Sequence, residues 1–324
     1  MSAALPIADL FQSLADPSRV RILMLLRTME LSVGELAQVL GQSQPRVSRH
    51  VKILGDAGLL DRHKEGSWVF LALTDKPRTR AVFDLIDQWL DPASRSLLAT
   101  DAVRLAAVRA DRAEAAQRYF SAHAEVWDSI RSMHVAESAV EQAIADAIGD
   151  RPVGKLLDIG TGTGRMIELL GPGASQAIGI DKSSEMLRLA RVKLEAAGIP
   201  SSLRQADMYA IPLADGSSDS VIIHQVLHFA QNPAAALSEA ARVLRPGGRL
   251  LVVDFAAHDR EELRTRDAHV RLGFTDEAMA GWFAAAGLEP DLVRHLAGGE
   301  LTVTLWRAVK PGGEKRAALD RQAA

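Results

Sequence analysis

Residues 156 to 166 read LLDIGTGTGRM, and this stretch decides the fold of the larger part of the chain. Gly160, Gly162 and Gly164 follow an apolar run that is typical of a strand, and a helical pattern begins at Arg165. Glycines at such a turn let the backbone bend tightly and approach a ligand closely. The fingerprint of a dinucleotide site would place a glycine where this chain has Arg165. The stretch therefore predicts a strand, a ligand-binding loop and a helix, with a spacing that differs from that of an NAD site.

Outward from this loop, short apolar runs alternate with helical stretches from residue 153 to residue 310. The runs are KLLDIG, SQAIGID, SSLRQAD, DSVIIH and GRLLVVDF. This alternation predicts a parallel sheet that is covered by helices on both faces. Two further runs, LVRHLA and ELTVTLWRAV, flank Gly298-Gly299 and predict a hairpin that places an antiparallel strand at the edge of the sheet.

Acidic residues stand at the ends of the second and third strands. Asp181 lies 17 residues past Gly164, where a carboxylate can accept the protons of both ribose hydroxyls. Asp207 and Met208 follow the third strand. Together with PLADGSSDSVIIHQVLHF and ARVLRPGGRLLVVDF, these ordered pieces resemble the class I S-adenosylmethionine (SAM) methyltransferases of the UbiE-like, type 11 group over about residues 119 to 310.

The resemblance implies an α/β Rossmann-like domain with a mostly parallel, seven-stranded sheet that binds SAM or its product S-adenosylhomocysteine (SAH). The cofactor-binding residues that it implies are Asp158, Gly160, Thr161, Gly162, Gly164, Asp181, Lys182, Met186, Asp207, Met208 and His224. The fourth strand lacks the (D/N)PP(Y/F) sequence of amino methyltransferases, so we do not expect methylation of adenine in DNA.

No catalytic residue is assigned from the sequence. Methyl transfer mainly needs in-line approach of the two reactants, so a dedicated base is optional. His224, His228, Asp254 and His258 lie near strand ends, where substrates bind in such sheets, but residues of this kind are more often structural. The methyl acceptor is therefore left unknown.

The first 76 residues show another pattern, that of short helices followed by a hairpin. Apolar residues at helical spacing cover 3–14 and 18–27, with a break at Asp16-Pro17. Ser32 and Glu35 form an S-x-x-E capping box at the start of a third helix.

Ser43 is the expected N-cap of a fourth helix, in which Val47, Val51 and Leu54 face inward. Two strands, 59–63 and 67–73, are expected around a glycine turn and would form a wing. This is the pattern of a winged helix-turn-helix, an α+β domain whose second helix of the motif enters the major groove.

Residues 10 to 73 resemble the ArsR/SmtB family of winged-helix repressors, because LADPSRVRIL, ELSVGEL, SQPRVSRHVKIL and AGLL occur in the family's order. The resemblance implies double-stranded operator DNA as a partner. Founding members carry sensor cysteines where this chain has Ser32 and Gly34, so these positions cannot bind arsenite or a soft metal through sulfur. The DNA-binding residues expected from the helix and the wing are Ser43, Gln44, Arg46, Ser48, Arg49, Lys52, Arg62 and Lys64.

Between the two patterns, residues 77–133 are rich in helix signals, and Leu97, Leu98, Leu105 and Val108 fall at helical spacing. The segment is either a linker or a pair of dimerisation helices. The second reading is favoured, because recognition helices commonly work in symmetric pairs. The expected division is therefore 1–76 for DNA binding, 77–133 for linking and homodimerisation, 134–310 for SAM binding, and 311–324 as a disordered tail.

The composition limits the chemistry further. The chain has no cysteine, which excludes disulfides and thiolate metal sites, and no metal ligand set is assigned. The start of the chain lacks a leader pattern and no run is long and apolar enough for a membrane span, so we expect a soluble, cytoplasmic protein. Residues 1–80 hold 11 Lys and Arg against 8 Asp and Glu, while the rest of the chain holds 27 against 33. The excess of positive charge therefore lies in the part with the DNA-binding pattern.

Two functions remain open from the sequence. The first is a transcriptional regulator whose second domain senses SAM or SAH and so reports on the methionine cycle. The second is an active small-molecule methyltransferase that carries a DNA-binding domain.

Overall fold

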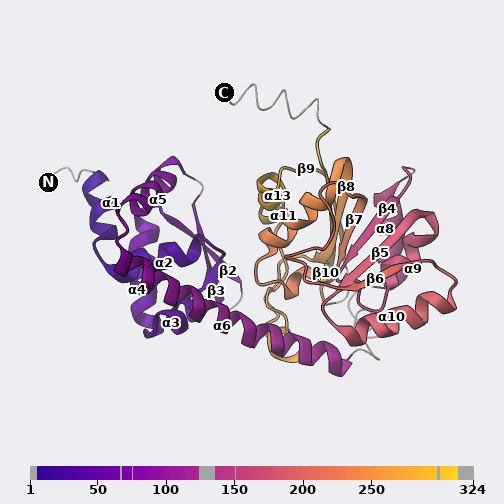
Figure 1. Ribbon diagram of the computed structural model, residues 1–324, viewed down its shortest axis with the longest axis horizontal. Helices are drawn as coiled ribbons and strands as arrows, with labels where there is room; N and C mark the ends of the chain where they lie inside the picture. Colours follow the sequence, from indigo (N-terminus) through magenta and orange to yellow (C-terminus); the bar gives the residue numbers. More distant parts are fainter. Residues whose placement is uncertain are drawn as a thin grey trace. The chain divides into compact units, whose positions relative to one another are not determined.

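The structure is a computed structural model that describes residues 6–65, 68–74, 76–123, 136–149, 151–297 and 300–312. For residues 6, 63–65, 68, 109 and 111–123 it describes the backbone alone. The chain forms two compact units, Met1–Glu114 and Ala115–Ala324 (Figure 1). Each unit has a hydrophobic core of its own.

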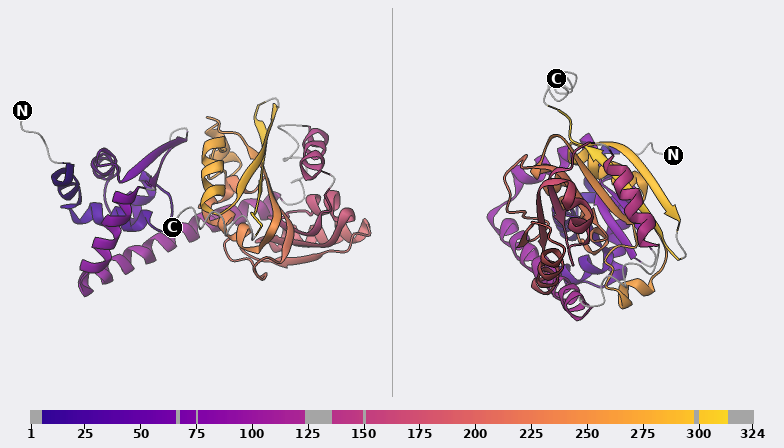
Figure 2. Two further views of the ribbon diagram at one scale, coloured as in Figure 1. Left: turned by 90° about the horizontal axis from the view of Figure 1, so that it is seen from above. Right: turned by 90° about the vertical axis from the view of Figure 1, so that its right-hand side faces the viewer.

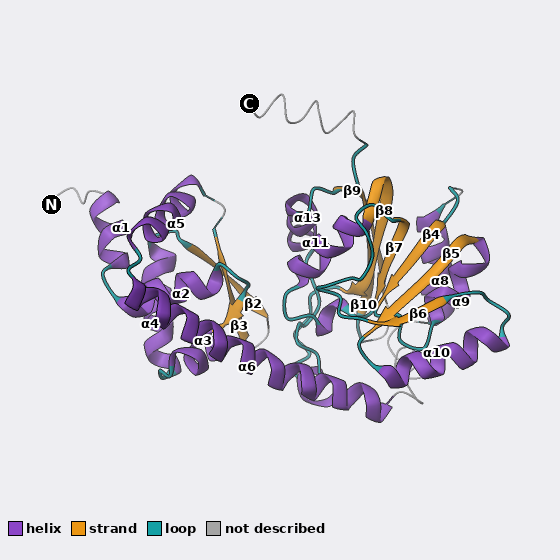
Figure 3. Cartoon of the chain, viewed as in Figure 1, coloured by secondary structure: helices purple, strands orange, loops and turns teal. Residues whose placement is uncertain are grey.

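The first unit combines helices with a small antiparallel sheet (Figure 3). The sheet order is β1-β3-β2, and Leu60 of β2 pairs with Leu73 of β3. This is the winged helix-turn-helix fold that the sequence predicts. Its elements are α1 (Pro6–Leu14), α2 (Pro17–Leu26), β1 (Leu31–Ser32), α3 (Val33–Leu40), α4 (Gln44–Asp56), β2 (Leu60–Glu65), β3 (Trp68–Leu73), α5 (Pro77–Trp89) and α6 (Pro92–His123), which continues into the second unit.

Side-chain caps mark the start of α2 and α3 in this unit. The capping box of α3 is confirmed, because the Ser32 amide donates to the Glu35 carboxylate at 2.6 Å and the Glu35 amide donates to the Ser32 hydroxyl at 3.2 Å. Ser43 occupies the N-cap position of α4, but its side chain makes no capping hydrogen bond, so that part of the prediction is wrong. Pro45 in the first turn has no amide hydrogen, which leaves fewer donors to satisfy there.

The start of α6 packs into the core of the first unit. Leu105 and Val108 are buried there together with Val82 of α5. Asp101 is only 1% exposed, and its two carboxylate oxygens each accept a hydrogen bond of 2.6 Å from the Arg21 guanidinium of α2. These residues of the predicted apolar stripe therefore face the chain's own core and are not available to a second copy.

The second unit is built on a seven-stranded sheet in the order β6-β5-β4-β7-β8-β10-β9. Strands β6, β5, β4, β7 and β8 run parallel to one another, and β10 runs antiparallel to β8. The predicted hairpin is present, but the antiparallel strand β10 lies one position in from the edge, and β9 is the edge strand. The strands are β4 (Gly154–Ile159), β5 (Ala174–Asp181), β6 (Ser202–Gln205), β7 (Ser218–His224), β8 (Leu244–Phe255), β9 (Glu289–Ala297) and β10 (Thr302–Val309).

Helices cover both faces of this sheet (Figure 2). One face packs on α11 (Pro233–Val243) and α13 (Asp276–Ala285), and the other on α8 (Glu137–Ile148), α9 (Arg165–Leu170) and α10 (Ser184–Ala196). Near-continuous burial of Leu250, Leu251, Val252 and Val253 in β8 reflects this double cover. The Rossmann-like α/β fold is confirmed. A short helix, α12 (Glu262–Arg266), follows β8.

Among the helices that the structure describes, none is long and apolar enough to cross a membrane.

Candidate functional site

The glycine loop lies at the carboxyl end of β4, as predicted. Gly160, Gly162 and Gly164 all have positive φ angles, of 71°, 52° and 85°. A Cβ atom on Gly160 would lie 2.6 Å from a methyl group of Val226, so the loop has no room for a side chain there. The Gly160 amide donates to the Ile180 carbonyl of β5 at 2.8 Å, which fixes the loop against the neighbouring strand.

Asp181 is the last residue of β5, and its side chain is hydrogen-bonded to the glycine loop. One carboxylate oxygen accepts a hydrogen bond from the Gly162 amide at 2.8 Å, and the other accepts one from the Ser183 amide at 2.8 Å. Desolvation raises the pKa of the Asp181 carboxyl, while the amides of Ser183, Gly162 and Lys182 act in the lowering direction. An acidic acceptor beside a glycine loop at a strand end is the arrangement that binds the ribose of an adenosine cofactor in such sheets.

Other predicted cofactor residues surround this pair. Lys182 Nζ lies 3.7 Å from Asp207 Oδ2, and the Ala206 amide donates to the Asp181 carbonyl at 3.0 Å, so the ends of β5 and β6 meet. Thr161 donates its hydroxyl hydrogen to Asp158 at 2.6 Å, which places both in the support of the loop. Met186 is buried at the start of α10, and Met208 packs partly buried on the main core.

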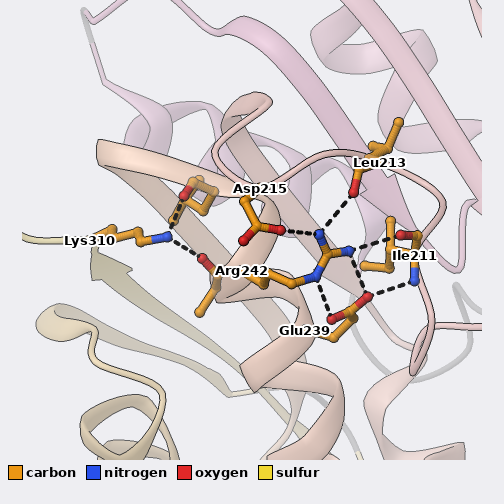
Figure 4. A network of polar contacts seen from close by, with 8 residues as sticks. Ile211, Leu213, Asp215, Glu239, Arg242 and Lys310 are labelled. Atoms are coloured by element: carbon orange, nitrogen blue, oxygen red, sulfur yellow. Dashed lines mark hydrogen bonds and ion pairs between the residues drawn. The ribbon is translucent and has the colours of Figure 1, made fainter.

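A polar network holds the segment that follows Asp207 (Figure 4). The Arg242 guanidinium of α11 donates to the carbonyls of Ile211 and Leu213 at 2.9 Å each and to Asp215 at 2.6 Å. Glu239 accepts from the Ile211 amide at 2.8 Å and from Arg242, and Arg242 lowers the pKa of Glu239. Sequence reasoning missed this network although Arg242 and Asp215 lie in quoted stretches, because their contacts join segments that are 27 to 31 residues apart.

His224 ends β7 and is half-buried, one strand across from the glycine loop. Val226, a residue that sequence reasoning missed, lies directly beside Gly160 of the loop. Gln225 between them has a positive φ of 49°, an uncommon conformation for a residue other than glycine. The left-handed turn aims the chain after β7 across the loop.

Two residues near the ends of β7 and β8 form a buried pair. His228 Nδ1 lies 2.7 Å from Asp254 Oδ1, and the His228 amide donates to Asp254 Oδ2 at 3.2 Å. Asp254 is fully buried and His228 is 2% exposed. Both were noted as strand-end residues in the sequence, but nothing there indicated that they meet.

The residues of α4 that are predicted to contact DNA lie on its exposed face. Gln44, Arg46, Ser48, Arg49 and Lys52 are exposed, as are Ser43 before the helix and Arg62 on β2. Val47, Val51 and Leu54 are buried as predicted. The Lys64 side chain lies outside the described part of the chain.

Among the described residues, no group of three or more His, Asp or Glu side chains is arranged to hold a metal ion.

Comparisons with known proteins agree with both units. The family model of the methyltransferase domain matches residues 157–252, and that of the bacterial regulatory protein, arsR family, matches residues 16–62. The phosphatidylethanolamine N-methyltransferase of Cereibacter sphaeroides is 32% identical over 163 residues, which are 49% of this chain and 76% of that protein. UbiE of Edwardsiella ictaluri, a ubiquinone/menaquinone biosynthesis C-methyltransferase, is 30% identical over 197 residues, 51% of this chain and 77% of that protein.

Other matches cover less of the relative or show the fold alone. The chain spans about half the length of an uncharacterised 37.1 kDa protein of transposon TN4556 from Streptomyces fradiae (35% identity, 50% of this chain, 47% of that protein). A chain of the solved complex that contains the Haloferax volcanii Trm112 methyltransferase activator has a TM-score of 0.50 at 21% identity, with 59% of this chain and 97% of that chain covered.

A winged helix-turn-helix unit joined to a Rossmann-like unit with this glycine loop defines a DNA-binding regulator domain fused to a SAM-dependent methyltransferase domain. The chain belongs to the UbiE-like family of SAM-dependent methyltransferases and carries an ArsR-family helix-turn-helix in front of that domain. The second unit is therefore a domain that binds SAM or SAH.

Proposed function

We propose that this protein is an ArsR-like transcriptional regulator that senses SAM or SAH in its second unit and binds operator DNA with its first. The observation that carries the proposal is the placement of α6. Its start is part of the core of the DNA-reading unit, through Leu105, Val108 and the Arg21–Asp101 pair, and the same helix continues into the cofactor-binding unit. A change in the second unit thus has a covalent, helical route to the first.

The position of the missing sensor cysteine supports this reading. Ser32 is 3% exposed and its hydroxyl accepts the Glu35 amide in the capping box, so the residue has a structural role. A thiolate signal is excluded there, and the SAM site is the ligand site that remains assigned in the chain.

Within the cofactor site, Asp181 would accept the ribose hydroxyls, the loop from Gly160 to Gly164 would pass under the amino acid part, and Asp207 and Met208 would face the adenine. Asp158, Thr161, Lys182, Met186 and His224 complete the proposed set. When bound, SAM supplies an electrophilic methyl group on a positively charged sulfur.

The DNA-binding form is proposed to be a homodimer on a two-fold symmetric operator in the cytoplasm. Exposed apolar side chains on α5 and α6 support it, because Trp89 is 77%, Leu97 44% and Val103 71% exposed. A partner that covered these side chains would remove apolar surface from water, which favours association. In a sedimentation experiment, Trp89→Glu should shift the dimer toward monomer.

The test of the sensor is an operator titration of the full chain with and without saturating SAM or SAH. We expect the operator dissociation constant to change by roughly 5- to 150-fold. Asp181→Ala should remove the response, and neither arsenite nor zinc should produce one. Unchanged operator affinity with both ligands would contradict the proposal.

A second function, small-molecule methyl transfer by the same cofactor site, is favoured by the buried His228–Asp254 pair.

A further inference from the structure

The loop after β7 and the end of β8 place a histidine–aspartate pair next to the cofactor loop. Val226 packs on Gly160, and His228 follows two residues later in the turn Leu227–Phe229. Asp254 is the penultimate residue of β8. Since β4, β7 and β8 are consecutive neighbours in the sheet, the pair and the glycine loop lie at the same edge, at the point where the strand order reverses.

The hydrogen bonds of this pair fix its chemistry. His228 Nδ1 faces Asp254 Oδ1 at 2.7 Å, and Asp254 also accepts from the backbone amides of His228 and Phe255. A carboxylate held in this way keeps the proton of the neutral ring on Nδ1. Nε2 then carries the lone pair, and the hydrogen bonds that His228 makes to described residues do not use this atom.

Three aromatic rings, two of phenylalanine and one of histidine, pack around the His228 ring. The His228 ring centroid lies 4.0 Å from that of Phe229, 5.1 Å from that of Phe255 and 4.2 Å from that of His269. The amides of Val270 and Arg271 donate to the His228 carbonyl at 3.1 and 2.9 Å. The segment that follows β8 is therefore bonded to the turn that carries the histidine and shields it from water.

We infer that His228 is the general base of a methyl transfer to a phenolic hydroxyl, with Asp254 as its positioning residue. The inference rests on the cofactor site of the proposed function but not on its DNA response. A neutral amine needs no base before attack, and an aliphatic alcohol gives up its proton to imidazole far less readily than a phenol does. A phenol, with a pKa of about 10, lies within reach of a positioned histidine. The aromatic surroundings suit a flat ring.

The step balances without a further reactant. The phenolic proton moves to His228 Nε2 and the resulting imidazolium is stabilised by the Asp254 carboxylate. The phenolic oxygen forms a bond to the methyl carbon while the bond from that carbon to the sulfonium sulfur breaks. The electron pair of the broken bond stays on sulfur, which leaves SAH and an aryl methyl ether.

The experiment uses the full chain, SAM and two probe acceptors at one alkaline pH, phenol itself and 4-nitrophenol, which is already ionised there. The parent protein should methylate both. His228→Gln and Asp254→Asn should lower the rate on phenol by roughly 10²- to 10⁴-fold and the rate on 4-nitrophenol by less than about tenfold. His295→Gln is the matched control, because His295 also pairs with an aspartate, Asp276 at 3.1 Å, but uses both ring nitrogens and is half exposed.

Two measurements separate a catalytic role from a structural one. SAH affinity by calorimetry should stay within about threefold in all three variants, which shows a folded cofactor site and is independent of operator binding. In ¹⁵N-labelled parent protein, NMR should show the His228 proton on Nδ1, and Asp254→Asn should abolish this tautomer preference. Equal loss on both acceptors, no methylation of either acceptor by the parent protein, or a proton on Nε2 would overturn the inference.

Discussion

At the scale of single residues, the cofactor site depends most on one carboxylate. Asp181 accepts two backbone amides, and under the proposed function its remaining lone pairs would accept the ribose hydroxyls. We expect Asp181→Ala to weaken SAH binding by about 1–3 kcal/mol, because it removes a buried acceptor. Isothermal calorimetry measures this, with Glu195→Ala as the control on the exposed face of α10.

The same residue gives SAH binding a pH dependence. Desolvation raises the pKa of Asp181 above its ordinary value. The ribose hydroxyls need the ionised acceptor, so affinity should be full above the raised pKa and should fall as the pH drops through it. Bound SAH must then lower this pKa, and protons are released on binding within that window. Calorimetry in two buffers of different ionisation enthalpy detects the release, and an Asp181→Ala protein that kept the pH dependence would contradict the assignment.

The glycine loop offers a matched pair of substitutions. Gly160 and Gly198 have similar φ angles, of 71° and 67°, but a Cβ on Gly160 meets Val226 at 2.6 Å while one on Gly198 meets nothing within 4 Å. Gly198→Ala should cost only the backbone strain, about 1 kcal/mol. Gly160→Ala should cost more and also abolish SAH binding. Equal thermal shifts of the two variants would show that the loop is not tightly packed.

At the scale of the elements, we expect the exposed residues of α4 to divide into base contacts and phosphate contacts. Its exposed face carries Arg49 and Lys52, and its other face is buried by Val47 and Val51. Arg49→Ala should cost about 1–3 kcal/mol and relax operator specificity, while Lys52→Ala should mainly reduce the slope of binding against salt by about one. Operator and random DNA titrated at several salt concentrations distinguish the two. Arg78→Ala on α5 serves as the control, and identical effects of all three would contradict the α4 interface.

The ion pair between α2 and α6 can be compared with a more exposed ion pair of the same residue types. Arg21–Asp101 is largely buried, whereas Arg27–Asp87 has both side chains 45% exposed. Removing the partner of a buried charge costs about 3–5 kcal/mol, and an exposed pair contributes about 0–1 kcal/mol. Asp101→Ala should therefore increase hydrogen exchange along α2 and the start of α6, and Asp87→Ala should not. Equal protection from hydrogen exchange in both variants would show that the Arg21–Asp101 pair does not hold α6 on α2.

Periodicity and caps made most elements predictable from the sequence. Contacts between distant segments could not be predicted in this way. The spacing of LLDIGTGTGRM and the strand that ends at Asp181 were predicted correctly, because both depend on neighbours in the sequence, and the role of Asp181 toward a ribose stays a prediction. The pairing of His228 with Asp254, separated by 26 residues, depends on the strand order. The burial of Leu105 and Val108 in the first core could not be predicted either. An apolar stripe on a helix packs equally well against the same chain or against a second copy.

At the scale of the whole molecule, the two ligands must affect each other equally if the regulator works as proposed. A ligand shifts an equilibrium only through different affinities for its two states. If SAH changes operator affinity by a given factor, the operator must change SAH affinity by the same factor, since binding free energies are linked. We expect a factor of roughly 5 to 150, equivalent to about 1–3 kcal/mol. SAH calorimetry with and without saturating operator gives one factor, and operator anisotropy with and without SAH gives the other.

In Asp101→Ala, whose α6 is released from the first core, both factors should fall toward one while SAH affinity without DNA stays unchanged. Two unequal factors in the parent protein would show that a third equilibrium, such as dimer formation, is being measured, and factors of one in both directions would leave two independent domains on one chain.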